Sequence, residues 1–258
     1  MHPRASVFEL VVVQPQLLST PLASGTHMLA ALSGRHRPAP ALQPPVTVSH
    51  TTPAPGEASF MDWLEAELAE APGSDVYADV YSDAVAAVRQ WRRRYRGNQA
   101  LWRRLMRPER LVKEIVESAP VISAVCDFVD SADGPVTVVD LCCGKGYLSM
   151  LLAEMLPPAK LRGCVLVDKA WPRHDTPIGE SHINPEHLWP PYHDAWPIPL
   201  ATSKVDLKKR CSLRGLGERW LSGGRGDSGD GADGGPVLLL GVHLCGSMPA
   251  ASPKPSTR

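Results

Sequence analysis

The sequence lacks any uninterrupted apolar run of about 18 residues, so we expect a soluble protein that does not cross a membrane. It also lacks a Cys-x-x-Cys pair, which leaves a structural zinc site without support. The six cysteines lie mostly within or beside apolar runs, a pattern typical of buried thiols in a reducing compartment rather than of a disulfide framework. No charge of one sign dominates, because 27 basic residues balance 27 acidic ones. The whole chain therefore has no electrostatic attraction to nucleic acid, and local clusters of charge matter more.

Residues 1–57 contain almost no acid, since Glu9 is the only one before Glu57. The segment is rich in Pro, Ala, Ser, Thr and His, and its apolar run at residues 7–13 is too short to span a membrane. Such a composition is typical of a disordered leader, an over-extended gene start or an organelle transit peptide. We therefore expect no fixed element here. The expected location is the cytoplasm, or the chloroplast or mitochondrion if the segment is a transit peptide.

Residues 136–156, VTVVDLCCGKGYLSMLLAEML, predict a buried strand, a tight turn and an amphipathic helix. The run at 136–139 is apolar and mostly β-branched, which favours a parallel strand covered on both faces. Gly144 and Gly146 then allow a sharp reversal and a close approach of a ligand to the backbone. The N–H groups at the start of the following helix would face that ligand, as in nucleotide-binding proteins.

The details of the turn separate two classes of ligand. A dinucleotide fingerprint needs a third glycine, but Ser149 stands in its place, and a carboxylate at Asp140 would repel a pyrophosphate. The same carboxylate could accept hydrogen bonds from an ammonium group. Asp140-x-Cys142-x-Gly144-x-Gly146 resembles the first motif of class I S-adenosylmethionine (SAM) methyltransferases, with Cys142 in place of the first glycine. The alternatives are an NAD-type oxidoreductase and an ordinary strand–turn–helix without a ligand.

Three later strands are expected. Residues 164–168 form a second apolar run that ends in Asp168, at the distance where an acid reaches the ribose hydroxyls of an adenosine ligand; the alternative is an acid that merely ends a strand. A short third strand would precede Asp206, a candidate acceptor for an adenine amino group. The run at 237–242 predicts a fourth strand, and His243 follows it.

The pair DLCCGKGYLS and VHLCG resembles the subgroup of class I methyltransferases that includes eukaryotic tRNA 2′-O-methyltransferases, over about residues 110–246. The resemblance implies SAM as cofactor and an α/β fold, a partial doubly wound (Rossmann-like) parallel sheet. It implies that His243 orients the acceptor or takes its proton, whereas the alternative is a strand-end histidine bonded to backbone. The implied cofactor-binding residues are Asp140, Cys142, Gly144, Gly146, Asp168 and Asp206.

Residues 58–131 carry apolar residues at helical spacing and predict a helical cap, which Pro108 should interrupt and Pro120 should bend or restart. Within it, residues 89–113 contain ten basic side chains and a single acid, with three aromatic residues of the Trp and Tyr types among them. Arginines that pair with phosphates and aromatics that stack on bases predict an RNA-binding face. The alternative is a solvated helix face whose aromatics belong to the core. The basic residues are Arg89, Arg92, Arg93, Arg94, Arg96, Arg103, Arg104, Arg107, Arg110 and Lys113, and the aromatics are Trp91, Tyr95 and Trp102.

Residues 169–199 are rich in proline, tryptophan and histidine, and predict an ordered loop packed over its surroundings, such as a substrate lid. The spacing of its four histidines matches no metal-binding pattern, so we expect no metal. A flexible loop is expected at 223–235, where glycine and aspartate dominate.

These patterns divide the chain into a leader (1–57), a helical cap (58–131), a partial methyltransferase domain (132–246) and a disordered tail (247–258). A methyltransferase sheet of this class should have seven strands, so four suggest a truncated gene model, a short splice form or a fragment that needs a partner. The fourth strand would then be an exposed apolar edge unless a partner covers it. We expect a SAM-dependent methyltransferase acting on RNA, or a chain inactive in this short form. The alternative is a non-catalytic RNA-binding or scaffold protein with an eroded SAM pocket.

Overall fold

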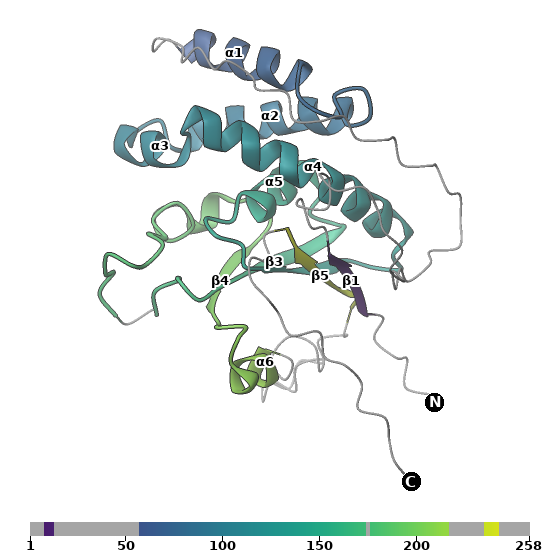
Figure 1. The fold of residues 1–258 in the computed structure, drawn as a ribbon, viewed down its shortest axis with the longest axis vertical. Coiled ribbons are helices and arrows are strands. Elements are labelled where there is room, and N and C mark those ends of the chain that lie inside the picture. The colour runs from purple at the N-terminus through teal and green to yellow at the C-terminus, as the bar shows by residue number, and fades with distance from the viewer. Residues whose placement is uncertain (1–7, 13–56, 174–175, 217–234, 243–258) are drawn as a thin grey trace, which may run out of the picture.

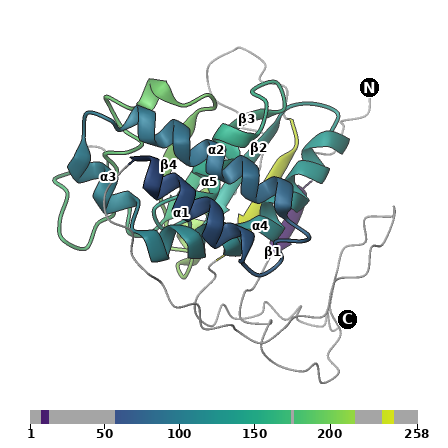
Figure 2. The ribbon, with the colours of Figure 1, turned by 90° about the horizontal axis from the view of Figure 1, so that it is seen from above.

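A five-stranded sheet with helices on both faces forms the molecule. The structure, a computed structural model, describes residues 8–12, 57–173, 176–216 and 235–242. Figure 1 shows helices α1 to α5 stacked above the sheet and α6 below it, and Figure 2 shows the cap from above. The helices are α1 (Glu57–Ala69), α2 (Ala78–Arg94), α3 (Gln99–Leu105), α4 (Pro108–Ser131), α5 (Tyr147–Met155), the 3₁₀ turn η2 (His193–Ala195) and α6 (Arg210–Leu216).

All pairings in the sheet are parallel, and the strand order is β1-β5-β2-β3-β4. From β2 the chain adds β3 and then β4 on one side, and returns to place β5 on the other side. The direction of winding thus reverses between β2 and β5, as in a doubly wound sheet. The expected α/β, Rossmann-like fold is confirmed. The strands are β1 (Phe8–Val12), β2 (Val136–Leu141), β3 (Leu161–Asp168), β4 (Leu200–Lys204) and β5 (Val237–Gly241).

The first strand corrects two expectations. We expected no element within residues 1–57, but Phe8–Val12 forms β1 and pairs with β5 from Phe8↔Val237 to Val12↔Gly241. We also expected the fourth predicted strand, β5, to be an exposed edge, whereas it lies between β1 and β2. An unpaired edge strand offers a row of backbone donors and acceptors, and an apolar, partly β-branched run is suited to pair with it.

The helical cap is predicted well, except at Pro120. The chain does break before Pro108, as predicted: α3 ends at Leu105, and Pro108 occupies the first turn of α4, where its missing N–H costs no intrahelical bond. Pro120 does not restart a helix, since α4 continues through it to Ser131. Buried residues on both sides of Pro120, including Ile115 and Ile122, pack against the rest of the protein and offset the lost hydrogen bond.

Apolar side chains cover both faces of the sheet. One core joins the cap and α5 to one face, with Val138, Leu166 and Leu238 among its buried residues. A smaller core on the other face includes Val139 and Leu216, the latter from α6. This double coverage explains why the strands are almost continuously apolar. Among the described helices, none combines the length and hydrophobicity that crossing a membrane requires.

Candidate functional site

The turn between β2 and α5 uses left-handed backbone at three positions. Cys142 has φ of 56°, Gly144 of 55° and Gly146 of 84°. Left-handed backbone disfavours a side chain by about 1–2 kcal/mol, which explains why a glycine suits the position that Cys142 occupies. The cysteine nevertheless keeps the turn that the sequence motif predicts.

The two glycines differ in their surroundings. A Cβ atom on Gly146 would overlap with the side chain of Leu166 on β3, so close packing as well as backbone conformation requires glycine there. A Cβ atom on Gly144 would meet nothing within 4 Å. Open space therefore lies beside the backbone of Gly144, where a ligand could approach it.

Asp140 lies at the carboxyl end of β2 and is only 2% exposed. The Oγ atom of Ser149, on the first turn of α5, donates a hydrogen bond of 2.9 Å to its Oδ2 atom. A small pocket adjoins this carboxylate at the point where β2 and β5 part, which is the ligand-binding position of doubly wound sheets. The pocket is lined by Glu114, Ser118, Asp140, Leu141, Cys142, Cys143, Leu148 and Val242.

Asp168 lies at the end of β3 and reaches across to the turn. Its Oδ2 atom accepts a hydrogen bond of 3.2 Å from the N–H of Gly144, and its Oδ1 atom accepts one of 2.8 Å from the N–H of Ala170. Each carboxylate oxygen can accept a second hydrogen bond. The structure thus brings Asp168 to the glycine turn, at the same edge of the sheet as Asp140.

No described side-chain contact brings the other two predicted site residues, Asp206 and His243, to the glycine turn. Asp206 follows β4, and its Oδ1 atom accepts a hydrogen bond of 3.1 Å from the N–H of Lys208, which stabilises its own turn. The preceding residue, Val205, donates from its N–H to the carbonyl of Asp168 at 3.2 Å. Asp206 is therefore near the site, but the described contacts of its side chain are local. His243 lies outside the described residues.

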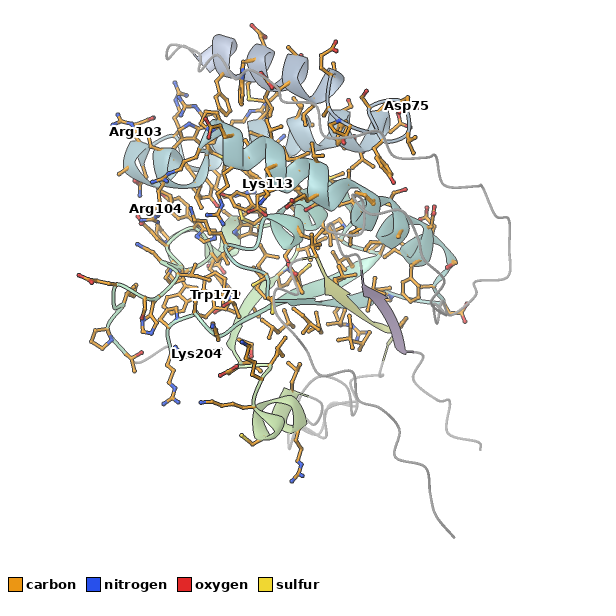
Figure 3. All side chains as sticks on the ribbon, in the orientation of Figure 1. Asp75, Arg103, Arg104, Lys113, Trp171 and Lys204 are labelled. Atoms are coloured by element: carbon orange, nitrogen blue, oxygen red, sulfur yellow. The ribbon has the colours of Figure 1, made fainter. Side chains whose placement is uncertain are left out.

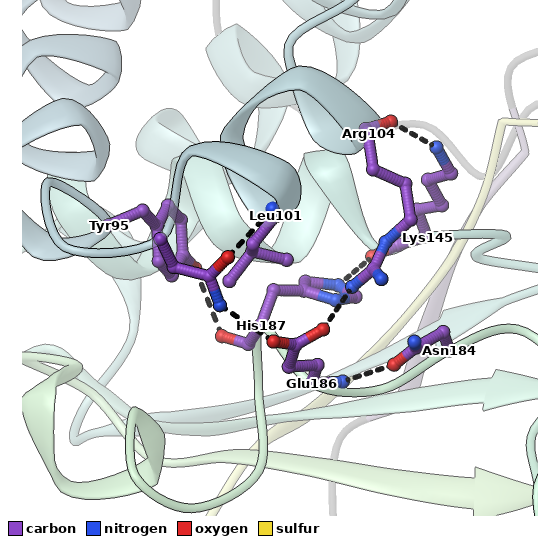
Figure 4. Close-up of polar contacts among 8 residues, drawn as sticks. Tyr95, Leu101, Arg104, Lys145, Asn184, Glu186 and His187 are labelled. Carbon is purple, nitrogen blue, oxygen red and sulfur yellow. Dashed lines mark hydrogen bonds and ion pairs between the residues drawn. The ribbon is translucent and has the colours of Figure 1, made fainter.

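The loop between β3 and β4 supplies a residue that sequence reasoning did not identify. His187 is fully buried, and its Nε2 atom lies 2.8 Å from the carbonyl oxygen of Lys145, between the two glycines of the turn (Figure 4). A carbonyl only accepts, so Nε2 carries the proton. Burial lowers the pKa of His187 to about 4, which keeps the ring neutral. The only signal in the sequence was the richness of this loop in bulky rings and prolines.

Neighbours of His187 tie the loop to the cap. The carbonyl of His187 accepts a hydrogen bond of 2.9 Å from the hydroxyl of Tyr95 on the cap. Glu186 accepts hydrogen bonds from Asn98 at 2.7 Å and from Arg104 at 2.9 Å, as Figure 4 shows for Arg104. Partial burial by itself would raise the pKa of Glu186, but these two hydrogen bonds lower it. The loop is thus packed between the cap and the glycine turn.

A second contact links the loop to the turn. The Nε1 atom of Trp171, which is fully buried, donates to Sγ of Cys143 at 3.4 Å. Burial, followed by the charge of Asp140, raises the pKa of the Cys143 thiol well above its ordinary value, so the sulfur is protonated at neutral pH. Lys204 donates to the carbonyl of Trp171 at 2.8 Å, and Figure 3 places Trp171 and Lys204 between the cap and α6.

Contacts within the protein involve both the aromatic rings and several arginines of residues 89–113. The predicted stacking of Trp91, Tyr95 and Trp102 on bases is wrong, because these rings are at most 8% exposed and belong to the core. The helical pattern places them on the inward face, as the alternative interpretation had it. Several arginines also have internal partners: Arg89 with Glu65, Arg92 over Trp102, Arg94 with Glu154 and over Trp196, Arg104 with Glu186, and Arg110 with Glu114.

Comparison with known proteins gives a match, and the matched segment contains the glycine turn. Residues 110–167 match a protein family described as a methyltransferase domain. The match supports a methyltransferase. The matched segment includes most of α4, all of β2 with its turn, α5, and β3 up to the residue before Asp168. No curated protein and no solved structure matches the chain. In the described part of the chain, no group of three or more His, Cys, Asp or Glu side chains is placed to hold a metal ion.

Proposed function

We propose that this protein is a SAM-dependent methyltransferase that acts on RNA. The observation that carries the proposal is the glycine turn at the point where the winding of the sheet reverses: Asp168 accepts from the N–H of Gly144, and the buried Asp140 lies at the same edge of the sheet. The family match over residues 110–167 supports the methyltransferase part. An eroded, non-catalytic pocket is the competing proposal.

The residues of the corner fit the chemical groups of SAM. Asp140 offers a buried carboxylate to an ammonium group, and burial strengthens that attraction. Asp168 has acceptor capacity left for ribose hydroxyls, beside the turn. Open space at Gly144 leaves the backbone accessible. A pyrophosphate would instead meet two carboxylates, which disfavours a dinucleotide.

SAM would supply a methyl group that its sulfonium already activates. The task of the protein is then to align the acceptor and to exclude water. Trp171 and His187 are fully buried against Cys143 and Lys145 of the turn, and they exclude water from the side of the turn that they cover. We propose that His243, which follows the pocket residue Val242 in the sequence, orients the acceptor or takes its proton.

RNA is proposed as the acceptor because some arginines of the cap are exposed and take no part in the internal ion pairs described above. Arg96, Arg103 and Arg107 are exposed, and no ion pair involves them among the described residues. Arginine binds phosphate oxygens through paired N–H groups. Since the aromatic rings of this stretch are buried, the support rests on the phosphates and not on the bases.

Calorimetric titration of SAM into the purified chain tests the cofactor site. Gly144→Val should lower SAM affinity by at least about tenfold, because a side chain would fill the open space and strain the backbone. Gly97→Val is the matched control: Gly97 also has open space, but it lies in the cap and its φ is not left-handed. Equal SAM affinity for the wild type and Gly144→Val, with the fold intact by circular dichroism, would contradict the proposal.

Methyl transfer is tested separately, with radiolabelled SAM and total cellular RNA. His243→Ala should lower the rate of transfer while leaving the affinity for SAM unchanged, because its proposed role concerns the acceptor. A chain that binds RNA with a steep salt dependence but shows no affinity for SAM would favour the non-catalytic alternative.

A further inference from the structure

We infer that four cationic side chains, where α3 and α4 meet the glycine turn, form a binding site for a backbone phosphate of RNA beside the cofactor pocket. This inference rests on the proposed function for the identity of the acceptor, but the site itself is argued from its contacts. The four residues, which we name the basic junction, are Arg104, Arg107, Arg110 and Lys145.

Lys145 is the centre of the basic junction. It stands between the two glycines of the turn and is half-buried, and its Nζ atom donates to the carbonyl of Arg104 at 2.8 Å (Figure 4). Among the described residues, no carboxylate lies within ion-pairing distance of Lys145. A lysine that is half removed from water and lacks a counterion is poised for an anionic ligand.

The three arginines lie close to Lys145. Arg104 provides the carbonyl to which Lys145 donates, Arg107 caps the start of α4, and the guanidinium of Arg110 lies 6.0 Å from the ring centre of Tyr147, two residues after Lys145. Burial lowers the pKa of Lys145 to about 8, and the charges of Arg110, Arg107 and Arg104, in that order, lower it further, while Glu114 raises it. Positive charge is thus in excess at this point. An anion placed among the four side chains would relieve the repulsion, whereas another cation would increase it.

The local acids do not neutralise the junction. Arg104 pairs with Glu186 at 2.9 Å and Arg110 pairs with Glu114 at 3.2 Å, so two of the four cations have a carboxylate partner. Glu109, on the first turn of α4, is exposed. The first backbone N–H groups of α4, which begins directly after Arg107, add partial positive charge at the same place.

The position of the basic junction suits an acceptor of the methyl group. Arg110 pairs with Glu114 one turn further along α4, and Glu114 lines the pocket beside Asp140. A phosphate bound at the junction would therefore place the attached nucleotide next to that pocket. Planar guanidinium groups match phosphate oxygens, and the three aromatic rings of residues 89–113 are buried, so we expect binding that depends little on base sequence.

Fluorescence anisotropy with a labelled oligouridine of about 12 nucleotides tests the site, at salt concentrations from about 50 to 200 mM. Arg107→Gln should weaken RNA binding by about tenfold and lower the slope of log K against log salt by about 0.7, the value for one lost contact to a single strand. Arg214→Gln is the matched control, because Arg214 is also exposed but lies on α6, on the other face of the sheet from the basic junction (Figure 1). An equal loss in both variants would overturn a defined site.

Two further measurements separate this inference from the proposed function. Lys145→Gln should weaken RNA binding as Arg107→Gln does, and Arg107→Gln should leave the affinity for SAM unchanged. If the wild type binds SAM but both variants keep full RNA affinity, the inference fails and the proposed function stands. If the variants lose RNA affinity while the wild type binds no SAM, the site stands and the methyltransferase proposal fails. Competition by polyglutamate as effective as by unlabelled oligouridine would overturn phosphate recognition.

Discussion

At the scale of single residues, His187 connects the loop between β3 and β4 to the glycine turn. Its ring is neutral because burial holds its pKa at about 4, below the ordinary value near 6.5. The Nε2–H group then donates a hydrogen bond of 2.8 Å to the carbonyl of Lys145 in the turn. The shape of the proposed cofactor site thus depends on a residue that is not part of the motif.

The pKa of His187 predicts how stability changes with pH. As pH falls below about 6.5, the unfolded chain takes up a proton on this ring before the folded chain does, so the free energy of unfolding falls until about pH 4. The loss should reach the order of 3 kcal/mol. His187→Gln keeps an N–H donor but does not titrate, so urea unfolding at several pH values should show a weaker dependence in this variant.

His193→Gln is the control for this measurement. His193 lies on the same loop, is half exposed, and contacts Asp194 at 2.9 Å. Its replacement measures the effect of removing an exposed histidine from the same loop. A His187→Gln variant with the full wild-type dependence would show that His187 does not titrate as its burial implies.

At the scale of elements, α2, α5 and the loop meet at one buried ion pair. Arg94 on α2 pairs with Glu154 on α5, and their side chains are 10% and 5% exposed. The same guanidinium lies 4.1 Å from the ring centre of Trp196 and donates to the carbonyl of Ala195 at 2.9 Å. One arginine of the basic stretch is therefore a structural link and is not available to RNA.

Glu154→Gln should lower the free energy of unfolding by about 3 kcal/mol, because it leaves the charge of Arg94 buried without its partner. Glu65→Gln, which breaks the exposed pair with Arg89, should lower it by less than about 1 kcal/mol. Urea unfolding of the two variants under the same conditions measures the difference. Losses of equal size would mean that burial does not distinguish the two pairs.

At the scale of the whole molecule, β1 closes one side of the sheet. Its partner β5 is strongly apolar, and its backbone groups on that side would otherwise be unpaired. The segment that composition marked as a leader therefore contributes an element of the fold. The remaining residues between β1 and α1 lie outside the described part of the chain.

Proline in β1 should weaken the pairing with β5. The N–H groups of neighbouring residues in a strand point in opposite directions, so at least one of Leu10→Pro and Val11→Pro removes a hydrogen bond to β5. That variant should associate as its concentration rises, which sedimentation velocity would detect. Glu9→Gln, which leaves the backbone unchanged, should sediment as the wild type does. Monomeric behaviour of both proline variants at all concentrations would argue that β1 does not protect the edge.

The sequence alone determined the features that depend on short-range pattern. The strand, turn and helix from Val136 to Met155 follow from an apolar run, two glycines and helical spacing, all within a few turns of chain. The cap helices follow from their apolar period, and the α/β class follows from the alternation of strands and helices. Cys142, which stands in place of the first glycine of the motif, adopts the left-handed backbone of the turn, with φ of 56°.

Only the tertiary structure decided which of these features act together. The strand at Phe8–Val12 forms by pairing with β5, which lies near the other end of the chain. Trp91, Tyr95 and Trp102, which the sequence pattern placed on an RNA-binding surface, are buried in the core. Gly146 must be glycine because Leu166 lies against it, while Gly144 faces open space. Contacts between distant segments leave no periodic trace in the sequence, because each partner is chosen by packing and hydrogen bonding in three dimensions.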